Sequence, residues 1–136
     1  MVYAHLKYSD KPFMGAVTAP ERAEDSITMA RIVFGDEFLE SNCVIKGNIN
    51  VNSPLVYDNT MSGALKAYAR ANQGVVITPF ILGGAMSPVT MPAAVAQAHA
   101  ETMVGVALTQ LVRPGSSAVY GNFLTTMDLK SGAPTF

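Results

Sequence analysis

Asparagine side chains alternate along one short stretch of this 136-residue sequence. Asn48, Asn50 and Asn52 would all lie on the same face of an extended strand, because successive side chains point to opposite faces. Amides on an apolar face are costly unless they are hydrogen-bonded, whereas a polar pocket satisfies them readily. We therefore predict that Asn50 and Asn52 bind a ligand. A plainer interpretation stays open, in which they belong to a loop with ordinary asparagine turn chemistry.

Aromatic residues follow two other apolar stretches and suit a cationic ligand. Phe80, Tyr120 and the earlier Tyr57 are candidates for the walls of a pocket, with Asn122 beside them. An alkylammonium ion over an aromatic face gains roughly 0.5 to 2 kcal/mol per contact. Asp58 would add Coulombic attraction, although it is equally placed to cap the next helix. Phe80 has its own alternative role, as a packing residue inside the sheet.

Several other chemistries have no support in the residue types. His5 and His99 are the two histidines of the chain, and neither lies in a metal-ligand motif, so we predict no metal site. Cys43 is the single cysteine and begins an apolar stretch, so we expect a buried structural thiol. No serine occupies a GxSxG turn, which removes the usual hydrolase signature.

The composition excludes some classes of protein. Residues are 49% hydrophobic and 14% charged, with 9 basic against 10 acidic side chains, so the chain is neither disordered nor suited to nucleic acid. The longest stretch of low charge, 90–112, carries too many polar residues for a membrane span. The beginning of the sequence also lacks the basic and apolar regions of a signal peptide. We expect a cytoplasmic protein that binds neither nucleic acid nor membrane.

Periodicity predicts strands that alternate with helices. The predicted strands cover 13–18, 43–51, 75–82 and 117–123, and the predicted helices cover 21–34, 60–73 and 93–111. Gly35 and Gly74 are expected to end the first two helices, and 36–40 could add one further turn. A polar tail follows the last strand.

This order of elements fits two architectures, a doubly wound sheet and a (β/α)8 barrel. No GxGxxG or Walker motif follows the first strand, which favours the barrel. A complete barrel typically needs about 250 residues. We therefore expect an α/β fold in which residues 1–136 form one partial TIM barrel domain, with about four parallel strands and three helices. Such a domain would be a fragment of a larger protein.

Several runs of residues are similar to one known family. They are Thr18-Ala19-Pro20-Glu21-Arg22-Ala23, Asn50-Val51-Asn52-Ser53-Pro54-Leu55, Ala67-Tyr68-Ala69-Arg70-Ala71-Asn72-Gln73, Thr78-Pro79-Phe80, Gln110-Leu111-Val112-Arg113-Pro114-Gly115 and Ser131-Gly132-Ala133-Pro134-Thr135-Phe136. Together with Lys11-Pro12-Phe13 they occur in order along the whole chain and resemble the trimethylamine methyltransferase family. None of them is a generic motif.

The resemblance implies a fold, a reaction and a partner. Family members are (β/α)8 barrels that move a methyl group from a methylated amine, such as trimethylamine or glycine betaine, to the Co(I) of a corrinoid protein. The corrinoid would be carried by that separate partner, so this chain would bind no cofactor directly. The pyrrolysine of the archaeal trimethylamine enzymes would fall after Phe136. The resemblance assigns no catalytic role to Asn50, Asn52, Phe80 or Tyr120.

Two further interpretations stay open. The chain is an inactive barrel remnant or a self-associating binding module in one of them, because part of a barrel leaves strand edges unpaired. For the same reason we expect a homo-oligomer. In the other, the chain is an unrelated doubly wound binding protein.

Overall fold

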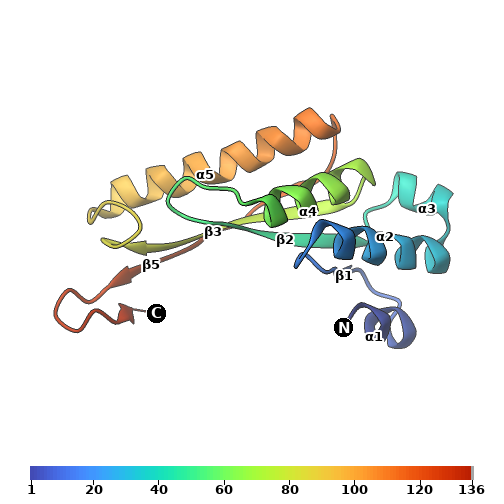
Figure 1. The fold of residues 1–136 in the computed structure, drawn as a ribbon, viewed down its shortest axis with the longest axis horizontal. Helices are drawn as coiled ribbons and strands as arrows, with labels where there is room; N and C mark the ends of the chain where they lie inside the picture. Colours follow the sequence, from blue (N-terminus) through green and yellow to red (C-terminus); the bar gives the residue numbers. More distant parts are fainter. Residues whose placement is uncertain (136) are drawn as a thin grey trace.

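The computed structural model describes residues 1–135 and shows a mixed α/β fold (Figure 1). The helices are α1 (Val2–Tyr8), α2 (Pro20–Phe34), α3 (Asp36–Ser41), α4 (Asn59–Arg70) and α5 (Met91–Val112). The strands are β1 (Phe13–Met14), β2 (Ile45–Val51), β3 (Gly74–Gly83), β4 (Ala118–Tyr120), β5 (Phe123–Met127) and β6 (Pro134–Thr135).

The sheet is curled and mostly parallel. β1, β2 and β3 are parallel neighbours, and β3 pairs with both β4 and β5 on its other side. The register of β4 and β5 against β3 is the same, since Ile77 pairs with Tyr120 and Phe80 with Phe123. The two segments are therefore one strand, interrupted at Gly121 and Asn122. β6 is antiparallel to β5 and forms a hairpin with it.

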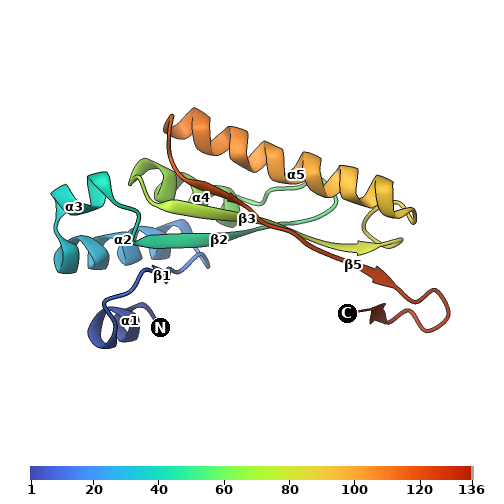
Figure 2. The same cartoon turned by 180° about the vertical axis from the view of Figure 1, so that it is seen from behind.

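Helices α2, α4 and α5 all cover the same face of the sheet, as the two opposite views show (Figures 1 and 2). Alternate residues of β3, such as Val75, Ile77 and Ile81, point to that face and are fully buried. Thr78 and Phe80 point to the other face, which no helix covers over β2 and β3. Helices on one face do not match the doubly wound alternative, in which both faces are covered.

The predicted order of elements is confirmed, and the two outer strands differ in length from the prediction. β1 is much shorter than 13–18, because Ala16 leaves the sheet and bonds to other elements: its amide donates to Ser26 Oγ and its carbonyl accepts from the Tyr68 hydroxyl. The last strand extends to Met127, and part of the expected polar tail forms β6. The short helix α1 has no counterpart in the prediction.

Two predictions around the third strand were wrong. α4 ends at Arg70, and Gly74 begins β3 and does not cap the helix. The turn between them is held by Gln73, whose Oε1 accepts from Val44 N and whose Nε2 donates to the Leu39 carbonyl. Gln73 is fully buried, so this amide replaces water for the backbone groups that it contacts.

Cys43 is exposed and not buried as expected. The residue precedes β2 and lies outside the strand, and its sulfur accepts a hydrogen bond from Gly74 N at 3.1 Å. Gly35, by contrast, is confirmed as the end of α2, with a φ of 85° that glycine adopts without strain.

None of the helices in residues 1–135 combines the length and apolar character needed to cross a membrane.

Candidate functional site

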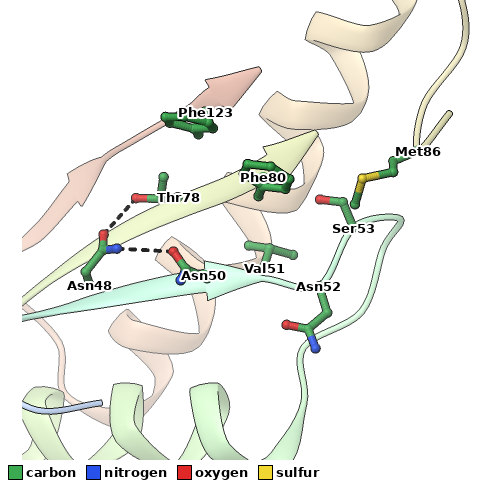
Figure 3. A pocket seen from close by; sticks show the side chains of 9 residues that line it. All are labelled: Asn48, Asn50, Val51, Asn52, Ser53, Thr78, Phe80, Met86 and Phe123. Carbon is green, nitrogen blue, oxygen red and sulfur yellow. Dashed lines mark hydrogen bonds between the residues drawn. The ribbon is translucent and has the colours of Figure 1, made fainter. Parts of the chain in front are cut away.

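A cavity of about 440 Å³ lies on the uncovered face of the sheet, toward the carboxyl ends of β2 and β3 (Figure 3). We call it the sheet-face pocket. Its lining residues come from two strands, from the start of β5 and from two loops: Asn48, Asn50, Val51, Asn52, Ser53, Thr78, Phe80, Met86 and Phe123. None of these side chains is charged.

The amide groups of β2 form a directed chain of hydrogen bonds (Figure 3). The Thr78 hydroxyl donates to Asn48 Oδ1 at 3.0 Å, and Asn48 Nδ2 donates to Asn50 Oδ1 at 3.1 Å. This order leaves the Asn50 NH₂ group as the end of the chain, and within residues 1–135 it makes no further hydrogen bond. Asn50 therefore presents two N–H donors beside the pocket, while its oxygen already accepts from Asn48.

Two phenylalanines form the aromatic part of the pocket. The rings of Phe80 and Phe123 are stacked, with centroids 5.2 Å apart and planes inclined by 16°. Their exposed fractions are 41% and 45%, so both rings keep surface that a ligand can cover. The pairing of β3 with β5 brings these residues together across 43 positions of sequence, since Phe80 and Phe123 are register partners.

Asn52 and Asp58 lie at the edge of the site and bond to each other. Asn52 Nδ2 donates to Asp58 Oδ2 at 2.9 Å. Asp58 is the N-cap of α4, since its Oδ1 accepts from Met61 N at 2.6 Å. Asp58 is not one of the pocket-lining residues. The structure thus places Asp58 in the capping role that the sequence had left open beside cation binding.

Tyr120 and Asn122 are not among the residues of the sheet-face pocket. Tyr120 is the register partner of Ile77, so it points to the face that carries the helices. There its hydroxyl lies 3.2 Å from Nδ1 of His99 on α5. Asn122 is exposed and lines a separate cavity with residues of β5. The structure therefore brings Asn50, Asn52 and Phe80 together and leaves these two candidates apart.

Tyr57 belongs to the loop between β2 and α4 and turns away from the pocket, toward α5. Its hydroxyl donates to the Glu101 carbonyl at 2.7 Å. Burial, with a contribution from the negative charge of Glu101, raises the pKa of Tyr57 to about 12. The phenol therefore stays neutral at physiological pH and serves as a hydrogen-bond donor. In the part of the chain that the structure describes, no cluster of three or more His, Cys, Asp or Glu residues could hold a metal ion.

Comparison with known protein families gives a match over the whole length of the chain. A family model described as trimethylamine methyltransferase matches residues 1–136. The chain belongs to the trimethylamine methyltransferase family. Its similarity to this family had been predicted from the runs quoted above, and that prediction is confirmed.

The relatives in the trimethylamine methyltransferase family are named for two kinds of substrate, betaines and trimethylamine. The glycine betaine methyltransferase of Desulfitobacterium hafniense is 38% identical over 98% of this chain, and the proline betaine:corrinoid methyltransferase of Eubacterium limosum is 25% identical over 94%. A trimethylamine methyltransferase of Methanosarcina thermophila is 38% identical over 47%. The chain covers 28% of the length of each betaine enzyme and 13% of the trimethylamine enzyme.

Sequence reasoning did not identify several residues that line or support the sheet-face pocket. Met86 and Phe123 line the pocket, but only Phe123 could be found from register, and that register requires the structure. Glu101 and Gln97 lie behind the pocket on α5. The burial of Glu101 could have been expected from the sequence, because it lies on the same helical face as the small buried residues Ala94, Ala98 and Gly105.

Proposed function

We propose that this chain supplies the amine-binding part of an enzyme that transfers a methyl group from a methylated amine to the Co(I) of a corrinoid protein. The observation that carries the proposal is the stacked Phe80–Phe123 pair beside the amides of β2, in a pocket without charged lining residues. Aromatic faces attract an alkylammonium ion and leave its methyl groups accessible. Membership of the trimethylamine methyltransferase family supports the same reaction.

A quaternary amine with a carboxylate, such as glycine betaine, suits this pocket better than trimethylamine. The NH₂ group of Asn50 offers two donors, which a carboxylate oxygen accepts, whereas trimethylamine has no such oxygen. The names of the two betaine relatives, which match almost the whole chain, support this choice. Trimethylamine remains the alternative substrate.

In this reaction, the residues of the sheet-face pocket would position the substrate and exclude water from it. When the corrinoid is bound, its Co(I) supplies a strong nucleophile, so that the N-methyl carbon moves from nitrogen to cobalt and the electron pair of the broken bond leaves with a neutral amine. Phe80 and Phe123 would hold the cation with one methyl group turned outward, and Asn50 would hold the other end of the substrate. A fixed orientation and a desolvated cation both favour an in-line displacement.

The fold of the whole enzyme forms part of the proposal. We infer that the curled sheet is one section of a (β/α)8 barrel, because parallel strands with helices on a single face repeat in that architecture. The sheet-face pocket would then open inside the barrel near its carboxyl-terminal rim, where barrel enzymes carry their active sites. A cytoplasmic location, a corrinoid protein as partner and self-association complete the proposal.

The alternative is a binding module without catalysis, which the uncovered face of the sheet would favour. A transfer assay separates the two. The enzyme that contains these residues would be mixed with a Co(I) corrinoid protein and with glycine betaine, trimethylamine or glycine. We expect the Co(I) absorbance to fall and dimethylglycine to form with glycine betaine, and no change with glycine. Binding of glycine betaine without dimethylglycine would support the binding module.

A further inference from the structure

Glu101 is a buried carboxylate that the proposed reaction does not use. It lies on α5, behind the sheet-face pocket, and is 2% exposed. Its Oε1 accepts from Leu55 N at 2.9 Å, and its Oε2 accepts from the Ser53 hydroxyl. Both donors belong to the loop between β2 and α4, which also carries Asn52. No ion pair of residues 1–135 includes Glu101, so hydrogen bonds alone compensate its burial.

Gln97 extends this contact to the second loop of the pocket. Its Nε2 donates to Glu101 Oε1 and to the Met86 carbonyl, both at 2.9 Å. Met86 belongs to the loop between β3 and α5 and lines the pocket. One turn of α5 thus bonds to both loops at the carboxyl ends of the strands.

Glu101 contacts Leu55, whose backbone has a conformation that leucine rarely adopts. Leu55 has a φ of 60°, in the left-handed region where a Cβ atom causes strain. A strained residue persists only when its surroundings hold it in place. The hydrogen bond from Leu55 N to Glu101 supplies that constraint, and Tyr57 adds a second contact by donating to the Glu101 carbonyl.

We propose that Glu101 is a positioning residue for the amine site: it holds the 52–55 segment, and through Gln97 the Met86 loop, in the conformation that completes the sheet-face pocket. This inference rests on the proposed function, because it assigns the pocket to the amine. Glu101 acts through hydrogen-bond acceptance and does not touch the substrate. Its charge is therefore dispensable, whereas its acceptor atoms are not.

Two substitutions separate the charge of Glu101 from its ability to accept hydrogen bonds. In Glu101→Gln, the amide oxygen still accepts from Leu55 N, and the new NH₂ group donates to Ser53 Oγ, which accepts as well as it donates. In Glu101→Met, a side chain of similar length offers no strong acceptor, and the donors of Ser53, Leu55 and Gln97 lose their partner. Gln110→Leu is the matched control, because Gln110 bonds Gly115 N and the Ser116 carbonyl at the opposite end of α5.

The experiment measures KM and kcat for glycine betaine in the enzyme that contains these residues. We expect Glu101→Met to raise KM about 10- to 100-fold with a smaller change in kcat, since small misplacements of a binding group have effects of that size. Glu101→Gln and Gln110→Leu should stay within about threefold of the parent. An unchanged KM in Glu101→Met, or an equal rise in Gln110→Leu, overturns the inference. An equal rise in Glu101→Gln overturns it too, because the charge would then be essential.

A second variant and a second measurement keep the test decisive. If Glu101→Met does not fold, Gln97→Leu replaces it: a raised KM supports the inference, and an unchanged KM overturns it. If the parent enzyme transfers no methyl group from any amine, the proposed function fails, and amide hydrogen exchange decides the role of Glu101 separately. Faster exchange at Leu55 in Glu101→Met, but not in Gln110→Leu, supports the inference, and unchanged exchange contradicts it.

Discussion

Single side chains set what the sheet-face pocket can recognise. The Thr78 hydroxyl and the Asn48 amide fix the orientation of Asn50, whose NH₂ group is left as a donor. Such a donor distinguishes ligands with an anionic end from plain alkylammonium ions. In the proposed function, the selectivity of the pocket depends on one amide more than on the aromatic pair, which would attract both kinds of ligand.

Asn50→Leu should weaken binding of glycine betaine and leave binding of tetramethylammonium nearly unchanged. A hydrogen bond to a charged group contributes about 1.5 to 3 kcal/mol, which corresponds to a rise in Kd of about 10- to 150-fold for the betaine. Calorimetric titration of the enzyme with each ligand measures the two constants. An equal loss for both ligands would show that Asn50 does not contact the carboxylate.

The candidate residues show how far sequence alone leads. The common face of Asn48 and Asn50 followed from strand geometry and is confirmed, because the side-chain period of a strand is two. Asn52 lies beyond the end of β2, and its amide donates to Asp58. The positions of Tyr120 and Phe123 depend on the register between β3 and the last strand. Along this strand, alternate residues point to the helices, and the residues between them point to the pocket. No local pattern reveals which residues face the helices and which face the pocket, so the sequence alone does not distinguish Tyr120 from Phe123 as a pocket residue.

At the scale of elements, caps and buried amides connect the strands to the helices. Asp58 begins α4, and Tyr68 of the same helix donates to the Ala16 carbonyl beyond β1. Helix α4 was predicted from its periodicity, but its end was not, because the side-chain bonds of the buried Gln73 replace a glycine cap. Long-range bonds of this kind have no signature in the local sequence.

Asp58→Ala should lower the free energy of unfolding by about 1 kcal/mol, the usual cost of losing an N-cap acceptor. Asp58→Asn should retain most of the stability, because its side-chain oxygen also accepts from Met61 N. Asp25→Ala on α2 is the control, since its ion pair with Arg22 is 3.7 Å long and exposed. Urea unfolding measures all three. Equal midpoints for Asp58→Ala and Asp25→Ala would contradict the capping role.

The stability of the chain should fall between pH 10 and pH 12. Burial raises the pKa of Tyr68 to about 12 from its usual 10.0, and in the unfolded chain the phenol ionises at the lower value. Folding is thus favoured fully below pH 10, and this contribution is lost as the pH rises toward 12. Tyr57 behaves in the same way.

Urea midpoints measured from pH 9 to pH 12 test this dependence. The fall should be smaller in Tyr68→Phe, which has no ionisable hydroxyl. Tyr8→Phe is the control, because Tyr8 is 76% exposed. If Tyr68→Phe loses as much stability over this range as the parent, burial of Tyr68 is not the cause.

At the scale of the whole molecule, one face and one edge of the sheet are left without a packing partner within residues 1–135. One face of the sheet carries no helix over β2 and β3, and β4 has a partner on only one side within residues 1–135. The order of strands and helices was predictable from periodicity. Periodicity alone does not separate one-sided from two-sided packing of helices, and the absence of a phosphate-binding motif favoured the one-sided packing that the structure shows.

The isolated 136-residue chain should self-associate through this uncovered part of the sheet. Val119 of β4 is 48% exposed there, and Val119→Lys should shift the chain toward the monomer in size-exclusion chromatography with light scattering. Leu129→Lys is the control on the β5–β6 turn, where Leu129 is 74% exposed. A parent chain that is monomeric at all concentrations would contradict this prediction.

The central claim is that the sheet-face pocket binds the methylated amine through its aromatic pair. The most direct test compares the Kd of glycine betaine for the enzyme containing these residues with that of its Phe80→Ala and Phe38→Ala variants. Phe38 is the matched control, since it lies on α3 and stacks on Phe34. We predict a rise in Kd of about 2- to 30-fold for Phe80→Ala, from the loss of one cation–π contact, and no change for Phe38→Ala. An unchanged Kd in Phe80→Ala would contradict the account.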